Sequence, residues 1–182
     1  MPIYIRARWR GRIYKARKKY FPVALLNQLN LYEGEAVDEW RSEWTRYNTN
    51  NWTRRLIGDA ATFRKTKRII HHYTMQLLTG HGIFNTYRVR INKETIDKCR
   101  DCDACPDDAE HALLRCPRYT VQRTTLENVV GDTFTVNNII ALVSAGDHTW
   151  GLFWSFCGAV MKARQAQEEV LTIAEEMETS DR

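Results

Sequence analysis

Apolar side chains recur every three or four positions along most of the chain, which is the spacing of one face of an α-helix. Val37, Trp40 and Trp44 show it clearly, and short polar or glycine-containing breaks separate such stretches. The pattern therefore predicts a mainly α protein. The helices expected from it cover residues 23–30, 35–47, 60–79, 83–89, 117–130, 136–144 and a long final segment that begins near His148.

The first twenty residues fit two patterns. Apolar residues alternate with arginines between Ile3 and Ile13, as in a β-strand with one buried face. Ile5, Trp9 and Ile13 are also four residues apart, as on one face of a helix. Both interpretations remain open from the sequence, and Pro22 is expected to end whichever element forms.

Some positions carry specific structural expectations. Gly80 is expected to end the helix that precedes it, because glycine readily adopts the left-handed conformation of a helix C-terminus. Four of the six tryptophans fit helical stripes, so we expect them in the core rather than on a binding surface. These are Trp40, Trp44, Trp150 and Trp154.

Composition resembles that of ordinary globular proteins. The chain has 182 residues and 21.4 kDa, with 43% hydrophobic and 27% charged residues, which suits one domain or two small ones. The richest apolar stretch, residues 150–161, is shorter than the roughly 20 residues that span a bilayer. Arg6, Arg8, Arg10 and Arg12 occupy the place of a signal peptide's apolar core. We therefore expect no membrane contact and a nuclear or cytoplasmic location.

The net charge of +5 is unevenly distributed. Residues 1–32 contain eight arginines and lysines and no acidic residue, so they carry +8 and leave −3 for the rest of the chain. A basic arm on a nearly neutral body is common in proteins that bind RNA or DNA. A solvated basic tail without a specific partner has the same composition, so charge alone leaves both interpretations open.

Four of the five cysteines lie close together, which favours a metal site over disulfides. Cys99, Cys102, His111 and Cys116 form the pattern C-x2-C-x8-H-x4-C. Three thiolates and one imidazole select Zn²⁺, and four protein ligands leave no open position for catalysis, so one structural Zn²⁺ is expected. Cys105 leaves an alternative open, because it can replace Cys99 in the pattern C-x2-C-x5-H-x4-C.

Basic residues outside the arm are further candidates for contacts with a phosphate backbone. One group lies in the helix expected over residues 60–79, and another lies close to the cysteines. Either group also fits an ordinary solvated surface. With the arginines of the arm, the candidate nucleic-acid-binding residues are Arg6, Arg8, Arg10, Arg12, Arg64, Lys65, Lys67, Arg68, Arg115, Arg118 and Arg123.

Several short motifs follow one another in an order that resembles one known family. They are Trp40-x3-Trp44, Trp52 to Ile57 (WTRRLI), Gln76 to Phe84 (QLLTGHG-x-F), Asp108 to His111 (DAEH) and Cys116 to Arg118 (CPR). This series resembles the C-terminal region of the reverse transcriptase polyprotein of arthropod non-LTR, type-1 retrotransposable elements, which insert at ribosomal DNA or similar fixed sites. The resemblance covers residues 35–170, whereas the arginine-rich first 34 residues match it poorly.

The resemblance implies a helical linker-type domain with a small inserted CCHC zinc knuckle, in which Cys99, Cys102, His111 and Cys116 hold the zinc ion. It implies that this region, beside the polymerase part of the polyprotein, helps hold RNA template and target DNA during target-primed reverse transcription. The expected organisation is a basic arm, a helical linker region, the zinc knuckle and C-terminal helices with an acidic tail, over residues 1–34, 35–95, 96–120 and 121–182.

We expect the chain alone not to be an enzyme, although the parent polyprotein resembles an RNA-directed DNA polymerase with an endonuclease. A polymerase palm needs aspartates that hold two metal ions, and the only Asp-Asp pair, Asp107-Asp108, lies among the cysteines. No phosphate-binding loop or nucleophile elbow occurs. The sequence therefore predicts a nucleic-acid-binding fragment or stand-alone descendant of such an element. The alternatives are a zinc-containing protein-interaction module and a remnant open reading frame without activity.

Overall fold

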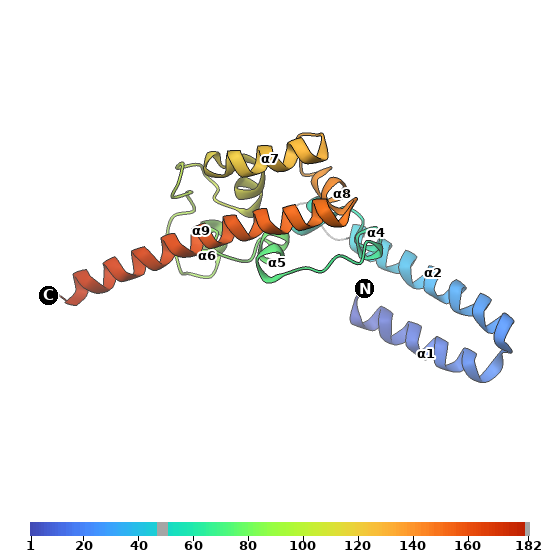
Figure 1. Ribbon diagram of the computed structural model, residues 1–182. Coiled ribbons are helices and arrows are strands. Elements are labelled where there is room, and N and C mark those ends of the chain that lie inside the picture. The colour runs from blue at the N-terminus through green and yellow to red at the C-terminus, as the bar shows by residue number, and fades with distance from the viewer. Residues whose placement is uncertain (47–50, 181–182) are drawn as a thin grey trace. The chain divides into compact units, whose positions relative to one another are not determined.

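The computed structural model describes residues 1–46 and 51–180, and every regular element within these ranges is a helix (Figure 1). The mainly α prediction is therefore confirmed. Two compact units, Met1–Lys67 and Arg68–Arg182, divide the chain.

The first unit begins with a hairpin of two long helices, α1 (Ile3–Lys19) and α2 (Pro22–Arg46), which pack against each other (Figure 1). Ile5 and Ala16 of α1 are buried, and they lie three turns apart on one face of the helix. The helical interpretation of the arginine-rich segment is thus the correct one. A helix wins over a strand here because α2 offers a helical surface against which that face is buried.

The second helix is longer than the sequence pattern indicates. Separate helices were expected over residues 23–30 and 35–47, but α2 is continuous through Gly34. The expected boundary between the basic arm and the helical linker region, after residue 34, therefore falls inside α2. A single glycine costs a helix only about 1 kcal/mol, so packing against α1 overrides it. Tyr47, expected at the end of this helix, lies outside the described residues.

The helix expected over residues 60–79 is wrong, because two helices, α4 (Ala60–Lys65) and α5 (His72–Thr79), replace it. Thr66 donates its hydroxyl to the carbonyl of Phe63 at 2.7 Å, and Lys67 then adopts a left-handed backbone with φ +53°. Such backbone conformations interrupt a right-handed helix. The first unit also contains α3 (Trp52–Ile57). The side chain of Asn51 caps the start of α3 by accepting a hydrogen bond from the backbone N–H of Arg54.

The second unit is organised around α9 (Asp147–Ser180), against which α5, α7 (Thr120–Val130) and α8 (Ile139–Ser144) pack (Figure 1). A short helix α6 (Asn85–Arg90), a single π-type turn η1 (His111–Arg115) and a 3-10 turn η2 (Pro117–Tyr119) lie between α5 and α7. Among the described residues, no helix combines the length and the apolarity that crossing a membrane requires.

Two of the four core tryptophan predictions concern α9, and they have different outcomes. Trp150 is buried as expected, and its indole N–H donates to the carbonyl of Ile69 at 2.9 Å. Trp154 is 42% exposed, so its placement in the core is wrong. Its ring stacks on that of His71 with centroids 4.3 Å apart. The buried face of α9 contains Phe153 and Cys157 instead.

A pair of glycine substitutions tests the difference between a helix end and a helix interior. Gly80 ends α5 with φ +69°, as predicted, so Gly80→Ala should lower stability by about 1–2 kcal/mol. Gly34 lies inside α2, where an added Cβ would meet no heavy atom within 4 Å. Gly34→Ala should therefore raise stability by up to about 1 kcal/mol. Urea unfolding followed by circular dichroism measures both changes, and equal effects of the two substitutions would contradict the assignment.

Candidate metal centre

Four side chains from two short segments bring their ligand atoms together in the second unit. The Sγ atoms of Cys99, Cys102 and Cys116 and a ring nitrogen of His111 all lie within 4.8 Å of one another. The Sγ atoms of Cys99 and Cys116 are 4.0 Å apart, and the Sγ of Cys102 is 3.3 Å from Nε2 of His111. These are the four residues of the C-x2-C-x8-H-x4-C pattern.

The distances fit a tetrahedral metal ion. Zn–S bonds of about 2.3 Å and Zn–N bonds of about 2.0 Å place neighbouring ligand atoms about 3.5–3.8 Å apart in a tetrahedron. The separations of 4.0 Å and 3.3 Å lie on either side of that range. Cys99, Cys116 and His111 are buried, and Cys102 is half-buried. A cation held here would have four protein ligands and little access to water, as in a structural site.

A tight turn places the first two cysteines on one side of the chain. The backbone N–H of Asp103 donates to the carbonyl of Cys99 at 2.9 Å, and the N–H of Cys99 donates to the carbonyl of Ala104 at 2.8 Å. Asp103 has φ +58°, a left-handed conformation that aspartate tolerates better than most residues. These hydrogen bonds close the chain from Cys99 to Ala104 into a turn that contains Cys102, and the sulfurs of the two cysteines lie close together.

The other two ligands lie at the two ends of η1. The side chain of Asp108 accepts a hydrogen bond from the backbone N–H of His111 at 2.7 Å and so caps the start of this turn. The N–H of Cys116 donates to the carbonyl of His111 at 2.7 Å. This wide, π-type closure spans five residues, so the imidazole and the thiol lie on the same side of the turn.

Burial controls the charge of these ligands. It raises the pKa of the Cys99 thiol to about 12, although the backbone N–H of Asp101 donates to the sulfur and acts in the opposite direction. Burial also raises the pKa of Cys116 and lowers that of His111. A lowered pKa favours the neutral imidazole, which is the form that binds metals. A divalent cation supplies the positive charge that buried thiolates need.

The remaining cysteines lie outside this cluster. Cys105 is exposed, its Sγ is 3.1 Å from Oδ1 of Asp97, and it is not part of the group of clustered ligand atoms. The alternative set that includes Cys105 is therefore not the one that the fold brings together. Cys157 is fully buried within α9, where burial raises the pKa of its thiol, as expected for a small core residue.

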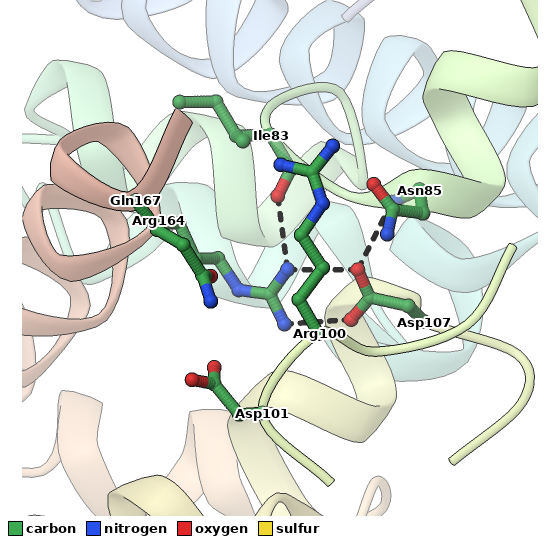
Figure 2. A pocket seen from close by; sticks show the side chains of 7 residues that line it. All are labelled: Ile83, Asn85, Arg100, Asp101, Asp107, Arg164 and Gln167. Carbon is green, nitrogen blue, oxygen red and sulfur yellow. Dashed lines mark hydrogen bonds and ion pairs between the residues drawn. The ribbon is translucent and has the colours of Figure 1, made fainter. Parts of the chain in front are cut away.

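A buried ion pair joins the cysteine-bearing loop to α9. Both carboxylate oxygens of Asp107 accept hydrogen bonds from the guanidinium of Arg164, at 2.6 Å and 2.9 Å (Figure 2). Asp107 also accepts the backbone N–H of Asn85 at 3.0 Å, and Arg164 donates to the carbonyl of Ile83 at 3.0 Å. This pair could not be predicted from the sequence, because the two residues are 57 positions apart and no local pattern connects them.

The arginines near the cysteines have different environments. Arg115 and Arg118 are half-exposed and form ion pairs with Glu110 and Asp101. Arg123 is only 8% exposed, and its guanidinium donates to the carbonyls of Leu113 and Cys116. We therefore withdraw Arg123 as a nucleic-acid-binding candidate, since its donors stabilise the chain around η1.

The other candidate cations also separate into two groups. Arg64, Lys65 and Lys67 are exposed at the end of α4 and just after it. Arg68 is mostly buried in the second unit, where it pairs with Asp147 and donates to the carbonyl of Ser144 at 2.7 Å. We therefore withdraw Arg68 as well, because a buried guanidinium with these partners does not reach a phosphate.

In α1, the four candidate arginines alternate between two roles. Arg8 and Arg12 form ion pairs with Glu39 and Glu35 of α2. Arg6 and Arg10, one helical turn apart, are exposed. Arg17, which was not among the residues predicted from the sequence, is exposed on the same side of the helix. Arg17 is about two helical turns from Arg10 and about three from Arg6. This spacing places it on their side as soon as the segment is known to be a helix.

Metal content tests the ligand set. The chain should bind one metal ion, and Cys99→Ser or Cys116→Ser should abolish tight binding because the site loses a thiolate. Cys105→Ser is the matched control and should bind one ion like the unmodified chain. Mass spectrometry of metal content after dialysis, and the thiolate-to-Co²⁺ absorption of a cobalt titration, measure this. Loss of metal in Cys105→Ser alone would mean that the other cysteine set is correct.

The buried ion pair gives a second prediction. Asp107→Asn or Arg164→Met leaves a buried group without its partner and should destabilise the second unit by about 3–5 kcal/mol. The double variant Asp107→Asn/Arg164→Met should lose less than the sum of the two single losses. Arg46→Met, which removes an exposed ion pair with Glu43, is the control and should change stability by at most about 1 kcal/mol. Additive losses in a urea-unfolding cycle would show that the pair is not coupled.

Comparison with known proteins agrees with the motifs. The chain is 24% identical over 159 residues to a retrovirus-related Pol polyprotein from type-1 retrotransposable element R1 4 of Nasonia vitripennis. The match covers 85% of the chain but only 40% of that relative's length. No protein-family model matches the chain, and no solved structure does. The resemblance drawn from the sequence is thus confirmed: the chain is distantly homologous to part of the Pol polyprotein of an R1 non-LTR retrotransposon.

Proposed function

We propose that the chain is a Zn²⁺-stabilised, nucleic-acid-binding part of a non-LTR retrotransposon polyprotein. Similarity to a Pol polyprotein and the Cys₃His cluster support the setting. The observation that carries the binding proposal is the exposed cationic side of α1, where Arg6, Arg10 and Arg17 share one side of a regular helix.

The spacing of these arginines suits a phosphate backbone. Arg6 and Arg10 are one turn apart, which corresponds to about 6 Å along the helix, and Arg17 lies about two turns farther on. The whole of α1 contains no acidic residue, so no carboxylate within the helix repels phosphate. Arg8 and Arg12 serve a different purpose, because their pairs with Glu39 and Glu35 hold α1 against α2.

The metal centre contributes a second, smaller basic surface. Arg115 and Arg118 flank Cys116 and retain about half of their side-chain exposure despite their ion pairs. Zn²⁺ would fix the turn from which both arginines project, and it would not itself contact substrate, because all four of its positions are filled by protein. Thiolate-rich ligands favour Zn²⁺ over Mg²⁺ or Ca²⁺.

In this proposal the chain holds RNA or DNA and does not catalyse a reaction. Polymerisation and strand cleavage would belong to other parts of the parent polyprotein. The match to this chain covers only 40% of the length of the related polyprotein. The chain would position template and target while the polymerase part extends the primer, as in target-primed reverse transcription. Because phosphate contacts dominate such binding, affinity should depend strongly on salt and weakly on sequence.

The salt dependence of binding tests this proposal. The zinc-loaded chain should bind a single-stranded RNA oligonucleotide, with log K falling linearly as log salt rises. Arg6→Gln/Arg10→Gln should weaken binding and reduce the slope by about 1.4, because each lost phosphate contact on a single strand contributes about 0.7. Fluorescence anisotropy at several salt concentrations provides both quantities.

A variant with the same change in net charge serves as the control. Arg41→Gln/Arg46→Gln removes two α2 arginines that already have acidic partners, so its slope should stay close to that of the unmodified chain. No binding of RNA or DNA by the zinc-loaded chain at low salt would refute the proposal. Equal slopes for both double variants would show that net charge, and not the side of α1, governs binding.

A further inference from the structure

The C-terminal part of α9 carries an exposed apolar stripe that nucleic-acid binding does not explain. Val170, Ile173 and Met177 are 66%, 57% and 67% exposed. With the exposed Ala166 they follow each other at intervals of four, three and four residues, so they lie in one row along the helix. This spacing is typical of a helix that packs against another helix.

The charges around this stripe indicate what kind of helix fits it. Residues 165–180 contain no arginine or lysine, and Glu169 and Glu176 lie beside the stripe, two turns apart. Two such segments packed in parallel would bring rows of glutamates together, which destabilises the pair. The stripe therefore favours a partner helix that is apolar in the middle and basic at its edges.

The outward side of α1 has these properties. Ile3 and Tyr14 are 79% and 62% exposed and share one side of the helix with Ala7, opposite the side that α2 covers. Ala7 and Gly11 are small residues near the middle of this side, and a Cβ added at Gly11 would meet no heavy atom within 4 Å. The bulky residues of the α9 stripe can approach closely there. Arg6, Arg10 and Arg17 lie along one edge of this side and Lys18 lies on the other edge.

We propose that residues 166–177 of α9 dock on α1 of a second copy of this chain. Bulky residues of α9 would pack over the small centre of α1, while Glu169 and Glu176 face its arginines and lysines. Such a contact joins two different surfaces, so it either closes reciprocally in a dimer or continues through further copies. It would cover the cations that the proposed function assigns to phosphate, so a second copy and nucleic acid would exclude each other on α1.

The mass of the full chain in solution tests this proposal, with zinc bound and nucleic acid removed. Analytical ultracentrifugation at low salt should show a mass at least twice the monomer's 21.4 kDa. The mass should fall toward the monomer's as salt rises, because screening weakens pairs between exposed charges. A chain that stays monomeric at about 0.1 mM protein and low salt would overturn the proposal. This holds also if α9 packs on α1 within one and the same chain, because the proposal concerns a contact between two copies.

Charge reversal on either side makes the test specific. Two variants reverse the charges on one helix each: Glu169→Arg/Glu176→Arg on α9 and Arg6→Glu/Arg10→Glu/Arg17→Glu on α1. Each variant should be monomeric alone, because the facing edges of α9 and α1 then carry charges of the same sign. Mixing the two variants restores opposite charges and should restore association. Glu33→Arg/Asp38→Arg, on exposed positions of α2, is the control and should associate like the unmodified chain.

Two results would contradict this contact even if association occurs. Association that neither charge-reversed variant weakens would place the interface elsewhere. Variants that are folded by circular dichroism but do not associate when mixed would show that charge pairing between α9 and α1 is not involved. Because these measurements contain no nucleic acid, neither result decides whether the chain binds RNA or DNA.

Discussion

The second unit depends on the buried ion pair between Asp107 and Arg164. A buried charge is costly unless an opposite charge and further hydrogen bonds meet it. Here the two groups bind each other and the backbone of Ile83 and Asn85, and only Nε of Arg164, among the polar atoms of the pair, is left without a hydrogen-bond partner in the described part of the chain. The pair joins three parts of the chain: the start of α6, the loop that carries Cys99 and Cys102, and the middle of α9. The metal-ligand loop is therefore fixed to the longest helix by charge as well as by packing.

A metal ion bound by the four ligands would fix only part of this arrangement, and the protein fixes the rest. A metal ion can hold four ligands together, but it does not orient the resulting knuckle on the rest of the unit. Asp107 lies between the ligands Cys102 and His111 in sequence, so its pair with Arg164 transmits the position of α9 to both of them. Arg123 acts on the other side, where its guanidinium binds the carbonyls of Leu113 and Cys116. Two buried arginines thus support the site without being ligands.

What the sequence predicted well depends on local spacing. The four metal ligands lie within two short turns, and Gly80 acts within a single helix end, so their roles follow from neighbours in sequence. The positions that were wrong depend on partners far away. Trp154 is exposed because α9 buries a different side of the helix. The break before α5 coincides with a hydrogen bond from Trp150 to Ile69, 81 residues earlier, which no local pattern records.

Partners that are far away in the sequence also change the interpretation of the basic charge of residues 1–32. Read as a sequence, they form an arm of +8 with no acidic residue. Read as a structure, they form one helix of a hairpin in which Arg8 and Arg12 pair with glutamates of α2. Arginines of a helical arm are therefore not equivalent, because their position around the helix decides whether they lie beside the glutamates of α2 or on another side of the helix. A surface for phosphate, or for an acidic helix, consists of the arginines that remain after the hairpin has formed.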